Sequence, residues 1–402
     1  MSPPQHFPLP QELIDSIIDQ LQDSRRDLLA CALVGHAWLP QCRKHLFRVI
    51  SCGPELSKPG ETSEEPLFRI ARAPIFAQHI PPLVHQLTFD CAYSPELLTM
   101  LLRSSSFIQL RHLTLSNVPL RHLHHTETRS LPEFLGQCPS LEHLALVKVP
   151  MRDISQLCSP DRLRNSRLRS LTLHSLTCTE DIAEQAEDTL LTGPRVELET
   201  LELKDVDPDL VDMLFCRHSS PFTLDSLKEL RLGDDGFEDL LREFGSSITH
   251  LSLHPPIASY TFLLNPYVLP QLRHLTVTGN DFKHDAIPSI LFQLGSSGLE
   301  LQTLTLPLTV LSAGYPEVGP GHDKLVCEFI RDTPSLERIV LSLRRKSKLR
   351  YHVLMSHPVM MVMKQREILM RLIESVKTGK LDVKIESDGV EWSSRQHLRW
   401  PE

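Results

Sequence analysis

The chain lacks the features that mark secreted and membrane proteins. No stretch approaches the ~20 apolar residues that span a bilayer. The first six residues have neither the basic start nor the apolar region of a secretory signal. The nine cysteines include no Cys-x-x-Cys pair, and no Asn-x-Ser/Thr acceptor occurs. These absences predict a cytoplasmic or nuclear protein with unpaired thiols.

Signatures of catalysis and metal binding are also missing. The sequence has no Gly-x-x-x-x-Gly-Lys-Ser/Thr loop, no Gly-x-Gly-x-x-Gly fingerprint and no Gly-x-Ser-x-Gly elbow. No group of cysteines and histidines has zinc spacing. We therefore expect no cofactor, no metal and no catalytic residue, although a triad assembled only in space stays open as an alternative.

The charge balance is mildly acidic, with 42 basic and 50 acidic residues and a net charge of −8. This balance argues against a nucleic-acid binder held by a general basic surface, and it leaves a local basic patch open. One dense basic run, residues 344–350, stays open as a nuclear-import signal, an acidic-partner contact or a solvated loop. The length of 402 residues exceeds one compact core, so we expect several units or one long solenoid.

The first fifty residues predict three short helices. Pro10 can begin the first helix, because a missing N–H costs nothing there. The second helix is predicted from Asp27, its N-cap, to Trp38, and the third from Pro40 to Phe47. Five aliphatic residues fall on one broad face of the first helix: Leu13, Ile14, Ile17, Ile18 and Leu21. So small a unit leaves apolar surface that must meet another surface.

From residue 83 onward one template recurs: aliphatic-x-x-aliphatic-x-apolar. The instances begin at Val84, Leu110, Leu141, Leu168, Leu198, Leu227, Ile248, Leu272, Leu301 and Leu336. Each predicts a strand with one buried face, followed by a returning segment. Returning helices are predicted at residues 95–102, 131–136, 182–191, 208–216, 237–244 and 324–330.

The other side of these strands is the predicted binding surface for a target protein, since it is broad and chemically varied. Its candidate residues are His112, His143, His174, Glu202, Lys204, Glu229, Arg231, His250, His274 and Arg338. Four of these histidines share one template position. They are either a pH-responsive or metal-binding ladder, or polar residues tolerated on an exposed face.

The C-terminal end predicts an amphipathic helix over residues 364–377 and an alternating strand over 380–386, which together close the sheet. The tail from Ser387 to Trp400 is either a disordered end or a recognition element. The predicted organisation is a helical module at 1–50, a linker at 51–82, a solenoid at 83–345 and a C-terminal cap and tail at 346–402.

The N-terminal module resembles an F-box. The matching residues are Leu9-Pro10-x-Glu12-Leu13, then Ile17, Leu21, Leu28, Cys31, Val34, Trp38, Leu46 and Phe47. The later repeats are similar to leucine-rich repeats, whose signature is Leu-x-x-Leu-x-Leu at about 20–29 residues per repeat. The expected fold is therefore α/β: a three-helix F-box-like module followed by a leucine-rich-repeat solenoid with a parallel sheet on its concave face.

This resemblance implies a non-catalytic substrate receptor of a cullin–RING (SCF-type) ubiquitin ligase. The F-box would dock a SKP-type adaptor and, through it, a cullin, while the repeats hold a target protein; no nucleic acid or membrane partner is expected. The adaptor-facing residues implied by the resemblance are Leu9, Pro10, Ile14, Ile17, Leu21, Leu28, Val34 and Trp38. The alternative is an interaction scaffold without a ligase role, whose helices only cap the solenoid.

Overall fold

The computed structural model describes residues 9–52, 79–90, 107–117, 131–149, 167–176, 195–216, 220–233, 237–254, 264–278, 286–309, 329, 333, 335–344, 382–387 and 390–393. Contacts divide the chain into two compact units. Unit 1 comprises Met1–Val196 with Arg217–Phe222, and unit 2 comprises Glu197–Cys216 with Thr223–Glu402. Each unit is described by itself.

Unit 1 begins with a module of three helices, α1 (Gln11–Gln20), α2 (Arg25–Ala32) and α3 (Leu39–Leu46). The helices enclose a small core, and Leu21, Cys31, Ala32, Trp38 and Phe47 pack against it. The buried residues of this core are Ile14, Ile18, Leu28, Cys42 and Leu46. The three predicted helices are therefore present, and they bury an apolar cluster of their own.

The predicted bounds of the second helix were wrong at both ends. Its N-cap is Ser24, whose hydroxyl oxygen accepts a hydrogen bond from the Asp27 N–H at 3.4 Å. Asp27 lies in the first turn, where its negative charge faces the positive end of the helix dipole. The helix ends at Ala32, ahead of Gly35, a poor helix former. Trp38 is instead the N-cap of α3.

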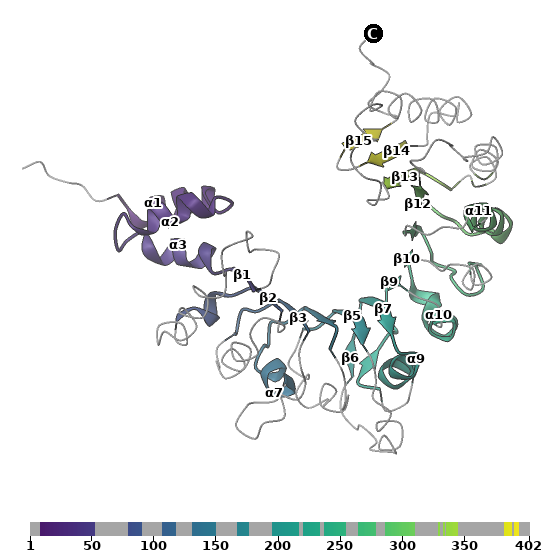
Figure 1. Cartoon of the computed structure of the whole chain (residues 1–402), viewed down its shortest axis with the longest axis horizontal. Helices are drawn as coiled ribbons and strands as arrows, with labels where there is room; N and C mark the ends of the chain where they lie inside the picture. The colour runs from purple at the N-terminus through teal and green to yellow at the C-terminus, as the bar shows by residue number, and fades with distance from the viewer. Residues whose placement is uncertain are drawn as a thin grey trace, which may run out of the picture. The chain divides into compact units, whose positions relative to one another are not determined.

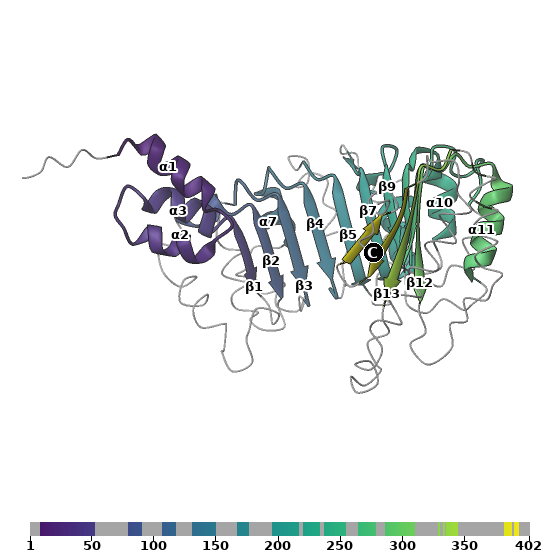
Figure 2. The same cartoon turned by 90° about the horizontal axis from the view of Figure 1, so that it is seen from above.

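Five parallel strands follow in unit 1: β1 (Val49–Cys52), β2 (Gln86–Asp90), β3 (His112–Ser116), β4 (His143–Val147) and β5 (Ser170–Leu176). Each pairs with the next in chain order. Figure 2 shows these strands side by side, with the helical module next to β1. The helix α7 (Leu131–Gly136) and a 3-10 turn at Pro81–Leu83 lie in the connections.

Unit 2 contains seven parallel strands: β7 (Thr200–Val206), β9 (Glu229–Leu232), β10 (His250–Leu253), β11 (His274–Val277), β12 (Thr303–Thr309), β13 (Arg338–Arg344) and β14 (Asp382–Ser387). The strand β15 (Val390–Ser393) then pairs antiparallel with β14. Two short strands, β6 (Val196–Glu197) and β8 (Phe222–Thr223), pair separately.

The connections of unit 2 contain helices. These are α9 (Pro208–Val211), which continues into the π-helical turn η6 (Asp212–Cys216), α10 (Glu238–Phe244) with the 3-10 turn η7 (Gly245–Ser247), and α11 (Ala286–Ser297). Figure 1 shows α9, α10 and α11 on the same side of the unit 2 strands. The other side of those strands is left to side chains that face solvent.

All ten template segments form strands, and each strand begins two residues after the first residue of its template. The predicted helices at 131–136, 208–216 and 237–244 are present as α7, α9 with η6, and α10. Those at 95–102 and 182–191, and all but Phe329 of 324–330, lie outside the described residues. The architecture is mixed α/β with parallel strand order, consistent with an α/β solenoid.

Several elements were not predicted. β1 fits the template through Phe47, Ile50 and Cys52, with an aromatic residue in the first position. The alternating strand predicted at 380–386, by contrast, is present as β14, which continues the sheet although Lys380 occupies the first template position. Part of the tail from Ser387 forms β15, so neither a disordered end nor a free recognition element describes residues 390–393. The helix α11 was also missed, and the predicted helix at 364–377 lies outside the described residues.

The chain leaves several strands through the same unusual backbone conformation. Asn117, Lys148, Ser175 and Asp205 have φ between 51° and 54°, although none is glycine. Each stands seven residues after the start of its template. The Lys148 N–H then donates to the His174 carbonyl of the next strand at 2.8 Å. The repeat therefore fixes the turn at the strand end as well as the strand itself.

Gly245 is expected to tolerate no larger side chain. A Cβ at this position would lie 2.5 Å from the Val268 carbonyl oxygen and 3.2 Å from the Leu269 Cδ2. Gly245→Ala should lower the free energy of unfolding by about 1–3 kcal/mol, because the backbone at Val268 must shift. Chemical denaturation of the full-length protein measures the change.

Gly35→Ala is the matched control, since no atom lies within 4 Å of the Cβ it would add. We expect it to leave the denaturation curve unchanged or to stabilise the module slightly. Equal curves for wild type and Gly245→Ala would contradict the close packing of η7 against Val268.

Candidate binding surfaces

The predicted target-binding residues lie on the exposed face of the strands in both units. In β3, for example, Leu113 and Leu115 are buried, while His112 and Thr114 alternate with them and face outward. The same alternation places all ten predicted residues away from the core: His112, His143 and His174 in unit 1, and Glu202, Lys204, Glu229, Arg231, His250, His274 and Arg338 in unit 2. Each unit therefore presents some of the predicted residues on the exposed face of its own strands.

The four histidines that share a template position form two stacked pairs. His112 and His143 lie in register on β3 and β4, with ring centroids 4.3 Å apart and an interplanar angle of 4°. His250 and His274 stack on β10 and β11 at 4.1 Å and 20°. Burial and the neighbouring His143 lower the pKa of His112. Burial and the neighbouring His250 likewise lower the pKa of His274.

This stacking disfavours the metal-binding interpretation of the histidines. A ring nitrogen binds a metal through a lone pair in the plane of the ring, and nearly parallel rings direct these lone pairs side by side. Each pair therefore cannot converge on one ion without rotating a ring. Within the described residues, no group of three or more His, Cys, Asp or Glu side chains is placed to hold a metal. The pairs remain candidates for pH-sensitive contacts.

Charges on β7 and β9, the first two strands of the unit 2 face, are paired with one another. The Arg231 guanidinium lies 2.7 Å from the Glu229 carboxylate and 3.5 Å from the Glu202 carboxylate. The hydrogen bond from Arg231 to Glu229 is the main cause that raises the pKa of Arg231. Next to them, Gly233 approaches Lys204 so closely that a Cβ would lie 2.6 Å from Lys204 Cγ. A partner that binds this face therefore contacts charged side chains that are already paired with one another.

The helical module exposes an apolar stripe along α1. Leu9 is 53% exposed, Leu13 52% and Ile17 43%; Leu13 and Ile17 lie four residues apart on one face of α1, and Leu9 lies just before its N-cap, Pro10. Leu29 within α2, and Leu33 and Val34 just after it, are also exposed. We call these six residues the apolar stripe. Three of them, Leu13, Leu29 and Leu33, were not predicted to face a partner, although the four-residue spacing from Leu9 was a signal for Leu13.

Two predicted adaptor-facing residues must be withdrawn. Ile14 and Leu28 are buried in the core of the module itself, so neither can face a partner. Leu21 and Trp38 are partly buried and pack against that core. The exposed members of the predicted set are therefore Leu9, Pro10, Ile17 and Val34.

An exposed polar contact joins α1 to α3. The Asp19 carboxylate accepts a hydrogen bond from the Gln41 side chain at 2.5 Å and contacts His45 Nε2 at 2.6 Å. The hydrogen bond from Gln41, followed by the one from His45, lowers the pKa of Asp19. The contact supports the orientation of α1 and of the apolar stripe that α1 carries.

No model of a known protein family matches this chain, and no curated protein matches it. Within the part of the chain that the structure describes, no helix has the length and apolar character to cross a membrane. Function must therefore be argued from the surfaces themselves.

The lowered pKa of the two histidines predicts how stability depends on pH. His112 and His274 bind protons more weakly in the folded state than at their ordinary pKa of 6.5. The unfolded chain thus takes up more protons as pH falls through 6.5, so the melting temperature should drop between about pH 7.5 and about pH 5.5. The double variant His112→Gln/His274→Gln should show a smaller drop in thermal melts followed by circular dichroism.

His143→Gln/His250→Gln is a second test of the pairs, because it removes the partner ring from each of them. This variant should also reduce the drop, since His112 and His274 lose a neighbour that lowers their pKa. A drop as large as that of wild type in both variants would exclude the pairs as a source of the pH dependence.

Proposed function

We propose that this protein is a non-catalytic substrate receptor of a cullin–RING (SCF-type) ubiquitin ligase. In this proposal the helical module is an F-box that binds a SKP-type adaptor and, through it, a cullin. The strands are leucine-rich repeats whose exposed face binds a target protein. The observation that carries the proposal is the apolar stripe on a module that already has a buried core of its own.

The stripe supports a docking role because of its size and arrangement. Single exposed apolar residues are common on protein surfaces and need no explanation, but a contiguous set is typical of an interaction site. Here Leu13 and Ile17 lie on one face of α1 with Leu9 just before the helix, and Leu33 is 88% exposed just after α2. Complete burial of an exposed aliphatic side chain contributes roughly 1.5–3 kcal/mol, so a partner would gain most at Leu33 and about half as much at the residues that are already half-buried.

The mechanism that follows from this proposal is proximity. A target held on the strand face and an adaptor held on the module are joined by one chain, which raises the effective concentration of target lysines near a conjugating enzyme. No residue of this chain performs the chemistry. The proposal places the protein in the cytoplasm or nucleus, in keeping with cysteines that form no Cys-x-x-Cys pair.

The scaffold alternative is favoured by one observation. The module continues directly into the sheet: Phe47 packs against the core of the module, and Ile50, three residues later, pairs with Leu87 of β2. A helical end cap on a repeat protein would show the same continuity. In that case the protein binds partners through its strands and has no ligase role.

Substitution of residues in the apolar stripe distinguishes the receptor function from the scaffold function. Leu13→Glu/Leu33→Glu should weaken binding of a SKP-type adaptor by at least about tenfold, since charged groups would replace apolar contacts. Circular dichroism should remain unchanged, because both side chains are exposed. Binding is measured by pull-down and by surface plasmon resonance with the purified adaptor.

Ile108→Glu/Phe292→Glu is the control for this experiment. Ile108 is 53% exposed and Phe292 74%, and both lie outside the helical module. This variant should bind the adaptor as wild type does. If wild-type protein retains no SKP-type adaptor, the receptor function is wrong and the scaffold remains.

A further inference from the structure

The residue directly before each strand occupies one line along the edge of the sheet. In unit 1 the carbonyls of the first four such residues each accept two N–H groups from the next segment: for example, Arg48 from His85 and Gln86 at 2.8 and 3.0 Å, and His85 from Arg111 and His112 at the same distances. We call these residues the edge row. Its members are Arg48, His85, Arg111, Glu142 and Arg169 in unit 1, and Glu199, Lys228, Thr249, Arg273, Gln302 and Glu337 in unit 2.

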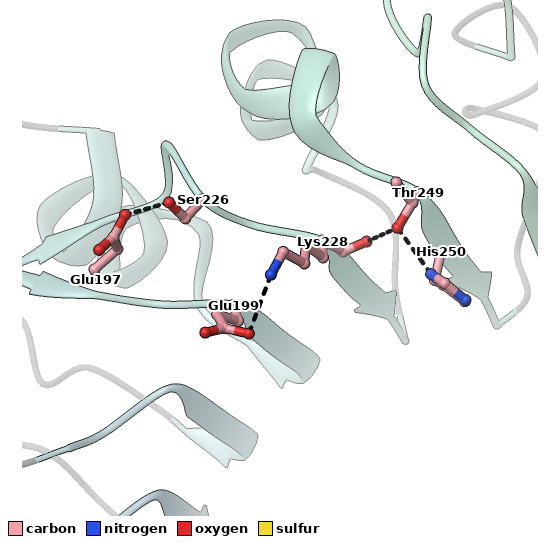
Figure 3. A network of polar contacts seen from close by, with 6 residues as sticks. All are labelled: Glu197, Glu199, Ser226, Lys228, Thr249 and His250. Carbon is pink, nitrogen blue, oxygen red and sulfur yellow. Dashed lines mark hydrogen bonds and ion pairs between the residues drawn. The ribbon is translucent and has the colours of Figure 1, made fainter.

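In unit 2 the cations of the edge row have acidic partners. Lys228 Nζ lies 3.4 Å from the carboxylate of Glu199, its neighbour in the row. Figure 3 shows this pair, together with the Thr249 hydroxyl that donates to the Lys228 carbonyl and contacts His250. Arg273 lies 3.3 Å from the Glu300 carboxylate. Positive charge at this position is therefore compensated within the unit.

In unit 1 the first two members have no acidic partner among the described residues, and the third has only a distant one. Arg48, His85 and Arg111 follow one another on neighbouring strands, with no acidic residue between them. Among the described residues, Arg48 has no ion-pair partner, and Arg111 reaches only Glu142, at 4.0 Å and on its far side. Burial, followed by the charges of Arg48 and Arg111, lowers the pKa of His85. The positive charges of both guanidinium groups thus act on the His85 imidazole, which lies between them in the edge row.

We propose that Arg48, His85 and Arg111 bind an anionic segment of the target protein through its carboxylate or phosphate groups. This inference rests on the proposed function only in that it takes the ligand to be a target protein. Neighbouring strands lie about 4.8 Å apart, so the three side chains cover roughly 10 Å, and side chains on one face of an extended peptide are spaced about 7 Å apart. Two anionic side chains on one face of the peptide fit this length, and arginine binds carboxylate and phosphate through paired hydrogen bonds.

The size of the site favours a peptide over a nucleic acid. Glu142 follows Arg111 in the edge row and ends the uncompensated stretch. Phosphate contacts supply most of the affinity for nucleic acid in a protein that makes about 6–10 of them, and three side chains supply fewer. The net charge of −8 adds long-range repulsion for a polyanion. A short acidic or phosphorylated segment needs fewer contacts than a nucleic acid, and its smaller negative charge is repelled less.

Fluorescence anisotropy with the full-length protein tests the proposal. The probes are three dye-labelled extended peptides that carry glutamate, phosphoserine or glutamine at alternate positions. At least one anionic peptide should bind with saturation and the glutamine peptide should not, and raised salt should weaken the binding. The anionic peptide that binds more tightly identifies the group as carboxylate or phosphate.

Two variants locate the site. Arg48→Gln/Arg111→Gln should weaken binding of the anionic peptide by at least about tenfold. Lys228→Gln/Arg273→Gln, which changes the compensated cations at the same position, should change it by less than about twofold. The melting temperature of the first variant should not fall, because the substitution removes repulsion between cations. Should that variant fail to fold, the charge-preserving Arg48→Lys/Arg111→Lys should retain binding in part.

Three results would overturn the inference: no saturable binding of either anionic peptide, equal affinity of Arg48→Gln/Arg111→Gln and wild type, or tighter binding of an oligonucleotide of equal charge. Retention of a SKP-type adaptor is measured on the same preparations. Adaptor binding without peptide binding overturns this inference alone. Peptide binding without adaptor binding overturns the ligase role and leaves the anionic site in place.

Discussion

The structure of each unit depends on the register of its parallel strands. Leu113 lies beside Leu87 and Leu144, and Leu275 lies beside Leu251 and Leu304, so the buried leucines of successive repeats form continuous rows. A slip of one residue would turn these rows to solvent, because side chains alternate between the two faces of a strand. Burial of the leucines thus fixes which outward-facing side chains become neighbours.

The binding surfaces follow from this constraint. Residues about thirty positions apart in the chain meet because they share a template position: two histidines stack at 4.3 Å in one unit and two at 4.1 Å in the other. The same rule lines up Arg48, His85 and Arg111, and pairs Lys228 with Glu199. Since each repeat adds one residue to every row, a few substitutions in one row can change the partner without disturbing the core.

The helical module obeys a different constraint. Its five buried residues come from all three helices, and they leave Leu13 and Ile17 of α1 and Leu29 of α2 exposed. The polar contact of Asp19 with Gln41 and His45 fixes α1 on α3, while β1 joins the module to the sheet. The apolar stripe thus lies on a module whose helices contact one another and continue into the sheet, and such a surface suits a partner protein. Docking of an adaptor is therefore the function we propose for it.

The sequence by itself determined the repeat, the strand positions and the outward-facing residues, because strand alternation and the leucine template are local and periodic. It also located three helices near the N-terminus. Only the tertiary structure decided which apolar residues of those helices are buried: Ile14 and Ile17 look alike in the sequence, yet Ile14 packs in the core and Ile17 is exposed. Register likewise decided which cations find acidic partners, because an ion pair depends on the distance across neighbouring strands and not on separation along the chain.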